Sequence, residues 1–481
     1  MKRAIGVAFF SIFAATTAGA ADLLSVYQDA LANDPQIREA DALRKASREV
    51  SPQAWSALLP QITGTGTVGR GKRDGAQQSA ETNPATGQVE LFSRTTILRP
   101  DSEGWTIDLR QNVFSWDNWA TVRAANAQVA QAEADYRAAE QALIQRAAQR
   151  YFAVLSAQDN LDAQQAAQDA FSRQLDQANK RFEVGLIAIT DVQDTKAARD
   201  QANASVIQAK RLLATAEEQL REVTGQKYDR LSKPGATMPL AAPSPAVEQE
   251  WVDMSLDQNL ALLSSRFQAD IARENVRVAF GGHLPTIDIV ASRGRGNSDG
   301  TVQFSSLDGT ISPERPFPLS NDDTTFGLQV QVPIFSGGFT QSRVREQQFR
   351  WIAAKERVTR TSRETERAAR DAYLGVISEM ARVEALRQAL ESSQTALKAT
   401  EAGYEVGTRT SVDVLDARRL LVQAQTNYYQ SRYDYLQNVI ALRLAAGNLD
   451  PKTLEELNAL LTVTATAPST APNAPPPPPA Q

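Results

Sequence analysis

Apolar residues recur at heptad spacing over long stretches of this chain, a pattern typical of helices that pack lengthwise. In segment 411–447 two adjacent stripes repeat every seventh residue, namely Leu415, Val422, Tyr429 and Leu436, and Leu421, Tyr428, Tyr435 and Leu442. Two adjacent stripes favour a helix that packs against two neighbours, as in a wall of helices. With comparable patterns at 118–182, 190–225 and 339–404, the sequence predicts four long helices in two hairpins. At 1.5 Å per residue the longest would extend on the order of 95 Å, so we expect an elongated molecule.

The chain contains an internal duplication. Residues 183–225 align without gaps with residues 405–447, and 12 of the 43 positions are identical. The pairs include EVG with EVG, DVQD with DVLD, and Gly225 with Gly447. We therefore expect two similar halves, a first repeat at 21–225 and a second repeat at 251–447, joined by a proline-rich linker at 226–250.

Outside the helices the apolar period changes from helical to two. The alternation predicts four strands, near 61–70, 104–114, 286–295 and 325–335. Each has about ten residues with one apolar and one polar face, which suits a membrane-crossing β-strand. Half-buried strands of a soluble sheet are the alternative. The segments 71–103 and 296–324 are polar and rich in Gly, Ser, Asp and Pro, so we expect exposed loops there.

The two ends of the chain have distinct compositions. Residues 1–20 read as an export signal, with Lys2 and Arg3 before an apolar run and Ala18-Gly19-Ala20 as the cleavage site. Its removal would change the net charge from −5 to −7, because two positive charges are lost, and an acidic chain does not suggest a nucleic-acid partner. Residues 448–465 should form a short C-terminal segment with a helix that begins at Asp450-Pro451. The proline-rich residues 466–481 should be a disordered tail.

Candidate chemistry is sparse. His283 is the single histidine and precedes a helix-to-strand proline, so a structural role is favoured over a ligand role. The stretch Gly64–Gly69 fits GxGxxG, but no helix follows, which favours a strand. Without cysteine the chain has no disulfide and no thiolate metal site. We expect no enzyme, no cofactor and no metal, with a secreted hydrolase as a minor alternative.

Four amphipathic strands cannot close a barrel, and open strand edges are forbidden in lipid. Eight strands are the smallest usual barrel, so several chains must pool their strands, and their helices would form a tube that continues the barrel. The expected result is a duct.

Three strings carry a family resemblance: LLSVYQDA at 23–30, VGLIAITDVQD at 184–194 and AGYEVGTRTSVDVLDA at 402–417. Over residues 22–461 the chain resembles the TolC family of outer-membrane efflux and secretion channels of Gram-negative bacteria. The resemblance implies a mainly α fold with a small transmembrane β part, in which a homotrimer forms a 12-stranded β-barrel continued by an α-helical barrel across the periplasm. It also implies outer-membrane lipid, a periplasmic adaptor and an inner-membrane transporter of the RND, ABC or MFS type as partners. Drugs, small toxic molecules or secreted proteins would be exported.

The resemblance also assigns roles to residues. Asp413 and Asp416 match the family's pore constriction, and Thr190, Asp191, Tyr404 and Arg409 match a gating latch that links the two hairpins. The tips that contact the adaptor match Val184, Gly185, Leu186, Val406, Gly407 and Thr408. Asp194 departs from the family pattern by adding a carboxylate in the first repeat, and the proline-rich tail has no family counterpart. A periplasmic coiled-coil adaptor is the alternative function, but it leaves the four amphipathic strands without explanation.

Overall fold

The computed structural model describes residues 20–71, 73–82, 86–235, 238–305, 313–316, 318–461 and 463–466. Residues 1–19 of the expected signal and residues 467–481 of the expected tail lie outside the described residues. The chain forms two compact units: the first unit contains residues 1–44, 132–265 and 357–481, and the second unit contains residues 45–131 and 266–356. Each unit takes residues from both predicted repeats, so the boundary between the units is not the boundary between the repeats.

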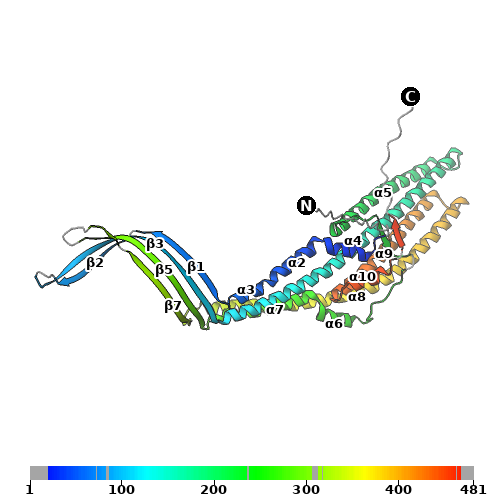
Figure 1. Cartoon of the computed structure of the whole chain (residues 1–481). Coiled ribbons are helices and arrows are strands. Elements are labelled where there is room, and N and C mark those ends of the chain that lie inside the picture. The colour runs from blue at the N-terminus through cyan, green and yellow to red at the C-terminus, as the bar shows by residue number, and fades with distance from the viewer. Residues whose placement is uncertain are drawn as a thin grey trace, which may run out of the picture. The chain divides into compact units, whose positions relative to one another are not determined.

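An antiparallel sheet dominates the second unit (Figure 1). Its principal strands are β1 (Gln61–Arg70), β3 (Val89–Phe114), β5 (Thr286–Ser305) and β7 (Leu319–Gln331), in the spatial order β1–β3–β5–β7. In addition, β2 (Arg73–Thr82) pairs with the first part of β3, and β6 (Arg315–Pro316) pairs with β5. The register aligns Ile62, Leu109, Ala291 and Phe326 across the four principal strands, so apolar side chains share one face of the sheet.

The two loops predicted at 71–103 and 296–324 are wrong over much of their length. Within 71–103 the described residues form β2 and the first part of β3, and within 296–324 they continue β5 and begin β7. Ladder hydrogen bonds need a partner backbone and not an apolar side chain, so pairing continues past the apolar segments. An ion pair of 2.7 Å between Arg70 and Asp101 joins β1 to β3 there. The fourth strand ends at Gln331 rather than at 335, because Pro333 has no N–H to donate to a ladder.

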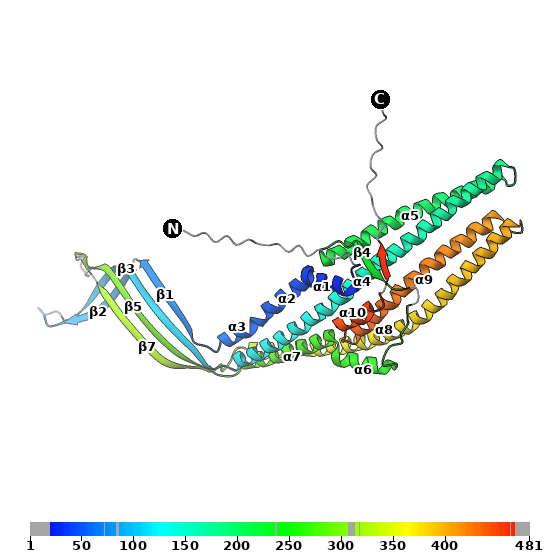
Figure 2. The ribbon, with the colours of Figure 1, turned by 45° about the vertical axis from the view of Figure 1, so that its right-hand side comes forward.

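Four long helices follow the predicted pattern closely. They are α4 (Trp116–Glu183), α5 (Ile189–Thr224), α8 (Phe339–Glu405) and α9 (Ser411–Ala445), and each bound lies within two residues of the prediction. In the first unit, α4 pairs with α5 and α8 pairs with α9 as two hairpins whose turns lie at the same end (Figure 2). The core between them is built from large buried side chains, among them Leu143, Tyr151, Phe152, Leu155, Tyr433, Leu436 and Ile440.

Shorter helices complete both units. They are α1 (Leu23–Asn33), α2 (Pro35–Arg48), α3 (Val50–Ser56), α6 (Glu248–Gln258), α7 (Leu260–Gly281) and α10 (Pro451–Asn458). The α1–α2 break falls at Asp34, because Pro35 suits the first turn of a helix and the Asp34 carboxylate accepts from the Gln36 N–H at 2.6 Å. The predicted start of α10 is confirmed: Asp450 caps it by accepting from the Thr453 N–H at 3.0 Å.

A small two-stranded sheet in the first unit was not predicted. It pairs β4 (Arg230–Lys233), which lies in the predicted linker, with β8 (Val463–Thr466) near the end of the described chain. On its other side β4 forms a parallel bridge with Ala21, through hydrogen bonds of 2.9 Å to the Arg230 carbonyl and 3.0 Å from the Ser232 N–H. Segments from the start, the middle and the end of the described chain therefore meet at one strand.

Candidate functional site

The two hairpin turns have the same backbone geometry. At the α4–α5 turn the Leu186 N–H donates to the Arg181 carbonyl at 2.9 Å and the Gly185 N–H donates to the Phe182 carbonyl at 2.8 Å. At the α8–α9 turn the equivalent bonds join Thr408 to Gly403 at 2.8 Å and Gly407 to Tyr404 at 3.2 Å. This double bond pattern is a Schellman motif, which requires a left-handed residue at its fifth position.

Glycine fills that position in both repeats. Gly185 has φ of +76° and Gly407 has φ of +79°, a backbone conformation that other residues adopt only with strain. The shared EVG string of the two repeats thus encodes one structural motif twice.

Apolar side chains project from both turns into solvent. Val184, Leu186 and Val406 are 69%, 73% and 75% exposed, respectively. Side chains of this type gain by burial against a partner, which agrees with their expected role as contact tips. That role stays a prediction.

Asp413 forms a capping box at the start of α9. Its carboxylate accepts from the Thr410 N–H at 2.8 Å and from the Thr410 hydroxyl at 2.9 Å, while its own N–H donates to that hydroxyl at 3.2 Å. These hydrogen bonds, with a smaller contribution from the nearby positive charge of Arg409, hold the pKa of Asp413 below its usual value. Asp413 is therefore ionised at neutral pH, and Thr410 is the N-cap of α9.

Asp416 lies one turn further along α9 and is exposed. Arg419 donates to it at 3.2 Å, with both side chains more than half accessible to solvent. An exposed ion pair of this kind contributes little to stability, so Asp416 keeps a solvated negative charge beside that of Asp413.

The four predicted latch residues lie at the hairpin ends but are not bonded to one another. Thr190 and Asp191 are in the first turn of α5, Tyr404 is in the last turn of α8, and Arg409 is in the turn before α9. Among these four described residues no hydrogen bond or ion pair joins one hairpin to the other. Within this single chain Arg409 acts on Asp413 instead, and the latch stays a prediction.

Two contacts near these residues were not predicted. The Arg181 guanidinium lies 4.7 Å from the centre of the Tyr404 ring, which links the end of α4 to the end of α8 by a cation–π contact. No pattern in the sequence predicts a contact between Arg181 and Tyr404. Arg418 also forms an ion pair with Glu401, joining α9 to α8. Glu401 lies four residues before the end of α8 and Arg418 seven residues after the start of α9, so pairing of the two helices from the turn places them within about one helical turn of each other.

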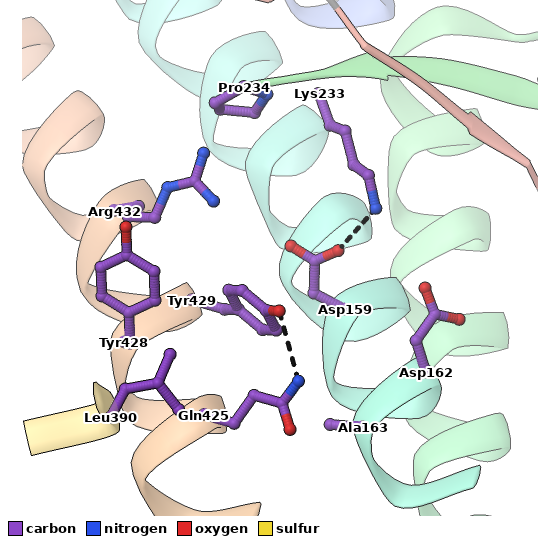
Figure 3. Close-up of a pocket in the computed structure, with 10 residues that line it drawn as sticks. All are labelled: Asp159, Asp162, Ala163, Lys233, Pro234, Leu390, Gln425, Tyr428, Tyr429 and Arg432. Carbon is purple, nitrogen blue, oxygen red and sulfur yellow. Dashed lines mark hydrogen bonds and ion pairs between the residues drawn. The ribbon is translucent and has the colours of Figure 1, made fainter. Parts of the chain in front are cut away.

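The structure also contains a pocket of about 460 Å³ beside β4 in the first unit (Figure 3). Asp159 projects toward it from α4 and is held by Lys233 at 3.1 Å and by the Tyr433 hydroxyl at 2.6 Å. Burial beside Asp159 raises the pKa of Tyr433, so this hydroxyl remains a hydrogen-bond donor. These two bonds join α4 to β4 and to α9, so Asp159 has a structural role.

Other candidates from the sequence also have structural explanations. His283 is exposed, and its ring lies 5.9 Å from that of Phe280 in an edge contact at the end of α7. The glycine-rich stretch 64–69 lies within β1, as predicted. Among the described residues, no cluster of three or more metal-binding side chains occurs. None of the described helices is both long enough and apolar enough to be a membrane span.

The described residues form paired long helices and an antiparallel sheet, and the sequence comparison identifies the class of protein as outer-membrane efflux and secretion channels. The family model of the outer membrane efflux proteins matches residues 26–226 and 251–448, so the chain belongs to the outer membrane efflux protein family.

Comparison with individual proteins shows which outer-membrane proteins the chain is similar to. The chain is 34% identical over 444 residues to the outer membrane protein TolC of Vibrio cholerae, covering 92% of this chain and 94% of that protein. It is 28% identical over 435 residues to the alkaline protease secretion protein AprF of Pseudomonas aeruginosa, covering 90% of this chain and 86% of that protein. The fold is similar to that of the Campylobacter jejuni CmeC outer membrane channel, with a TM-score of 0.69 at 19% identity over 92% of this chain and 90% of that one. The predicted TolC-family resemblance and the outer-membrane location with a large periplasmic part are thereby confirmed.

Proposed function

We propose that this chain is one subunit of a homotrimeric duct that exports drugs, small toxic molecules or secreted proteins across the periplasm and the outer membrane. The matching family is named for outer membrane efflux, and one relative is named as an alkaline protease secretion protein, which supports both efflux and protein secretion as activities of such a duct. The observation that carries the proposal is the open sheet of the second unit.

Strands β1 and β7 are the edges of that sheet. Among the described strands, β1 pairs only with β3, and β7 pairs only with β5. An unpaired row of backbone N–H and C=O groups cannot remain in hydrocarbon, because each unsatisfied group costs several kcal/mol. Edge-to-edge pairing of β1 with β7 of a second copy removes both edges. Three copies with four principal strands each give twelve strands, an even number large enough to close a barrel.

One face of the sheet has the character of a lipid-facing surface. On β7, Phe326, Leu328 and Val330 alternate with glycine and glutamine and are 79%, 64% and 55% exposed. The pairing register continues this apolar surface across the sheet through Ala291 and Leu109. Apolar residues at alternate positions would face lipid and the polar positions between them would face the lumen.

The hairpin ends would form the periplasmic entrance of the duct. Asp413 and Asp416 contribute two carboxylates per chain, so three chains would bring six around one axis. A ring of carboxylates attracts cations and excludes anions, which would make the closed duct cation-selective. Thr190 and Asp191 on one hairpin and Tyr404 and Arg409 on the other would latch the entrance through contacts made in the closed trimer.

The exposed tips would bind the rest of the export system. Val184, Leu186 and Val406 supply apolar contact area on rigid Schellman turns, which suits a periplasmic adaptor that presents complementary apolar side chains. The adaptor would in turn connect the duct to an inner-membrane transporter of the RND, ABC or MFS type.

Single-channel recording in planar bilayers tests the duct directly. The purified chain should insert as a trimer and give a small conductance that is selective for cations. Folded trimers that insert without conductance, or a chain that stays monomeric in detergent, would contradict the proposal.

A further inference from the structure

Three arginines of the second unit converge on one buried carboxylate. Glu274 on α7 has a side chain only 6% exposed, and it accepts from Arg277 at 2.6 Å and from Arg123 of α4 at 3.1 Å. Arg273 lies 3.6 Å from the same carboxylate and also pairs with Asp270 at 3.2 Å. Three positive and two negative groups leave a charge of +1 in this cluster.

The arginines keep unused donors. Arg123 reaches Glu274 through its Nε atom, and no described residue accepts a hydrogen bond from its two Nη groups. The side chains of Arg123 and Arg277 are 43% and 46% exposed, so these donors are within reach of a ligand from outside. Glu274 thus fixes two guanidinium groups in place while their outer N–H groups remain available.

An unsatisfied indole lies next to this cluster. The Trp116 ring centre is 5.4 Å from the Arg123 guanidinium carbon. Its Nε1 atom is shielded from water, and no described residue accepts its hydrogen bond. A shielded donor of this kind lacks the acceptor that buried polar groups normally have, so the side of the cluster next to Trp116 is one polar partner short.

Arg123 and Arg277 lie at similar distances from the junction between helices and strands. Arg123 is seven residues after the start of α4, and Arg277 is four residues before the end of α7, so both lie roughly 6–10 Å from the helix-to-strand junction. On each helix an exposed aromatic residue lies one turn nearer the strands on the same face: Trp119 for Arg123 and Phe280 for Arg277, at 44% and 47% exposure. A bilayer has a headgroup layer of about 5–8 Å on each side of its hydrocarbon core. The aromatic rings therefore match the boundary of the hydrocarbon, and the arginines match the headgroups.

We propose that Arg123 and Arg277 bind the phosphate of an anionic lipid headgroup in the periplasmic leaflet of the outer membrane. The inference rests on the proposed membrane-crossing sheet, which sets the level of the junction. Forked N–H donors recognise phosphate oxygens in pairs, and the aromatic rings one turn away hold the acyl side of the same lipid. Three such sites in a trimer would anchor the duct at a fixed depth.

Native mass spectrometry of the detergent-solubilised full-length protein tests this site with phosphatidylglycerol as the probe. The parent protein should retain the lipid. The R123Q/R277Q variant should bind it at least about tenfold more weakly, because each charge-assisted hydrogen bond to a phosphate contributes a factor of this size. Because that variant leaves the buried Glu274 carboxylate with Arg273 alone, at 3.6 Å, R123Q/E274Q/R277Q provides the same loss without that weakly compensated charge. The control R360Q/R367Q removes two exposed arginines of α8 and should bind as the parent does.

Three results would overturn the site. The first is equal lipid retention by the parent and both glutamine variants. The second is full retention by R123K/R277K, which keeps the charge but loses the guanidinium fork and would indicate diffuse attraction. The third is displacement of the lipid by equimolar inorganic phosphate, which would indicate a site for free phosphate. Conductance measured on the same samples separates this question from the duct itself, since an intact conductance without lipid retention refutes the lipid site alone.

Discussion

Two glycines with the same backbone conformation should respond very differently to alanine. Gly407 and Gly447 both end long helices with left-handed φ angles, +79° and +77°. A Cβ at Gly407 would meet nothing within 4 Å, whereas a Cβ at Gly447 would lie 2.4 Å from the Gln258 carbonyl oxygen and 2.8 Å from the Asn259 nitrogen. Because the two glycines have the same backbone conformation, comparing their alanine variants separates the energy of steric overlap from the energy of conformational strain.

The two energies can be estimated from these distances. The left-handed conformation costs a residue with a Cβ roughly 1–2 kcal/mol, and this applies at both positions. At Gly447 the overlap is with backbone, which cannot rotate away, and contact at about 3.5 Å would require a shift of about 1 Å. Overpacking of this kind adds about 1–3 kcal/mol. We therefore expect Gly447→Ala to cost roughly 2–5 kcal/mol and Gly407→Ala roughly 1–2 kcal/mol.

Hydrogen exchange read by mass spectrometry resolves the two effects by location. Gly447→Ala should accelerate exchange by tenfold or more, on the scale of about 1.4 kcal/mol per tenfold, in peptides that cover the end of α9 and the α6–α7 corner. Gly407→Ala should accelerate exchange less, and only around the α8–α9 turn. Equal effects, or a larger effect at Gly407, would refute the steric reasoning, because both variants carry the same conformational cost.

Three further predictions concern the entrance. Arg409→Ser should raise single-channel conductance relative to the parent, because it removes one partner of the proposed latch; an unchanged conductance would argue against the latch. Asp413→Ala with Asp416→Ala should reduce cation selectivity and relieve block by trivalent cations, and parental behaviour in both assays would refute the carboxylate ring. The lowered pKa of Asp413 means that its cap stabilises α9 above the unfolded-state pKa of about 3.9 and is lost as pH falls through the lower folded-state pKa. The protection factor of amides in the first turn of α9, that is, exchange corrected for its intrinsic pH dependence, should therefore fall on acidification below about pH 4, and Thr410→Ala, which removes the hydroxyl partner, should weaken this pH dependence.

The long helices were predictable because their signal is local and repeated. The heptad stripes of α9 persist for five turns or more, and glycine at the turn positions 185 and 407 marks where each hairpin reverses. The N-cap at Thr410 was also visible, because a hydroxyl residue followed three positions later by an acid is a capping pattern.

The full extent of the strands was not predictable from one strand at a time. The first part of β3 lacks a clean alternation, and its pairing with β2 and β5 is a property of two chain segments together. The β4–β8 pair has the same cause, because its strands are more than 200 residues apart and only four residues long. Segments of four mixed polar and apolar residues are too short to show a period that could be recognised.

Roles for the residues of the candidate site came from the family resemblance and stay predictions, whereas their contacts within the chain could not be predicted. Family resemblance located Asp413, Asp416 and Arg409, and the structure shows that Asp413 also serves as a helix cap. The contact of Arg181 with Tyr404 depends on how two hairpins pack, and no pattern along the chain encodes it.

The meeting of three segments at β4 has a consequence for the order of assembly during export. A chain that crosses the inner membrane from its first residue onward delivers Ala21 and β4 early, but β8 arrives only with the last part of the described chain. Until then one side of β4 has no neighbour. A truncated chain that lacks β8 would keep this edge of β4 unpaired. Periplasmic proteases could therefore distinguish truncated chains from complete chains before any subunit inserts into the membrane.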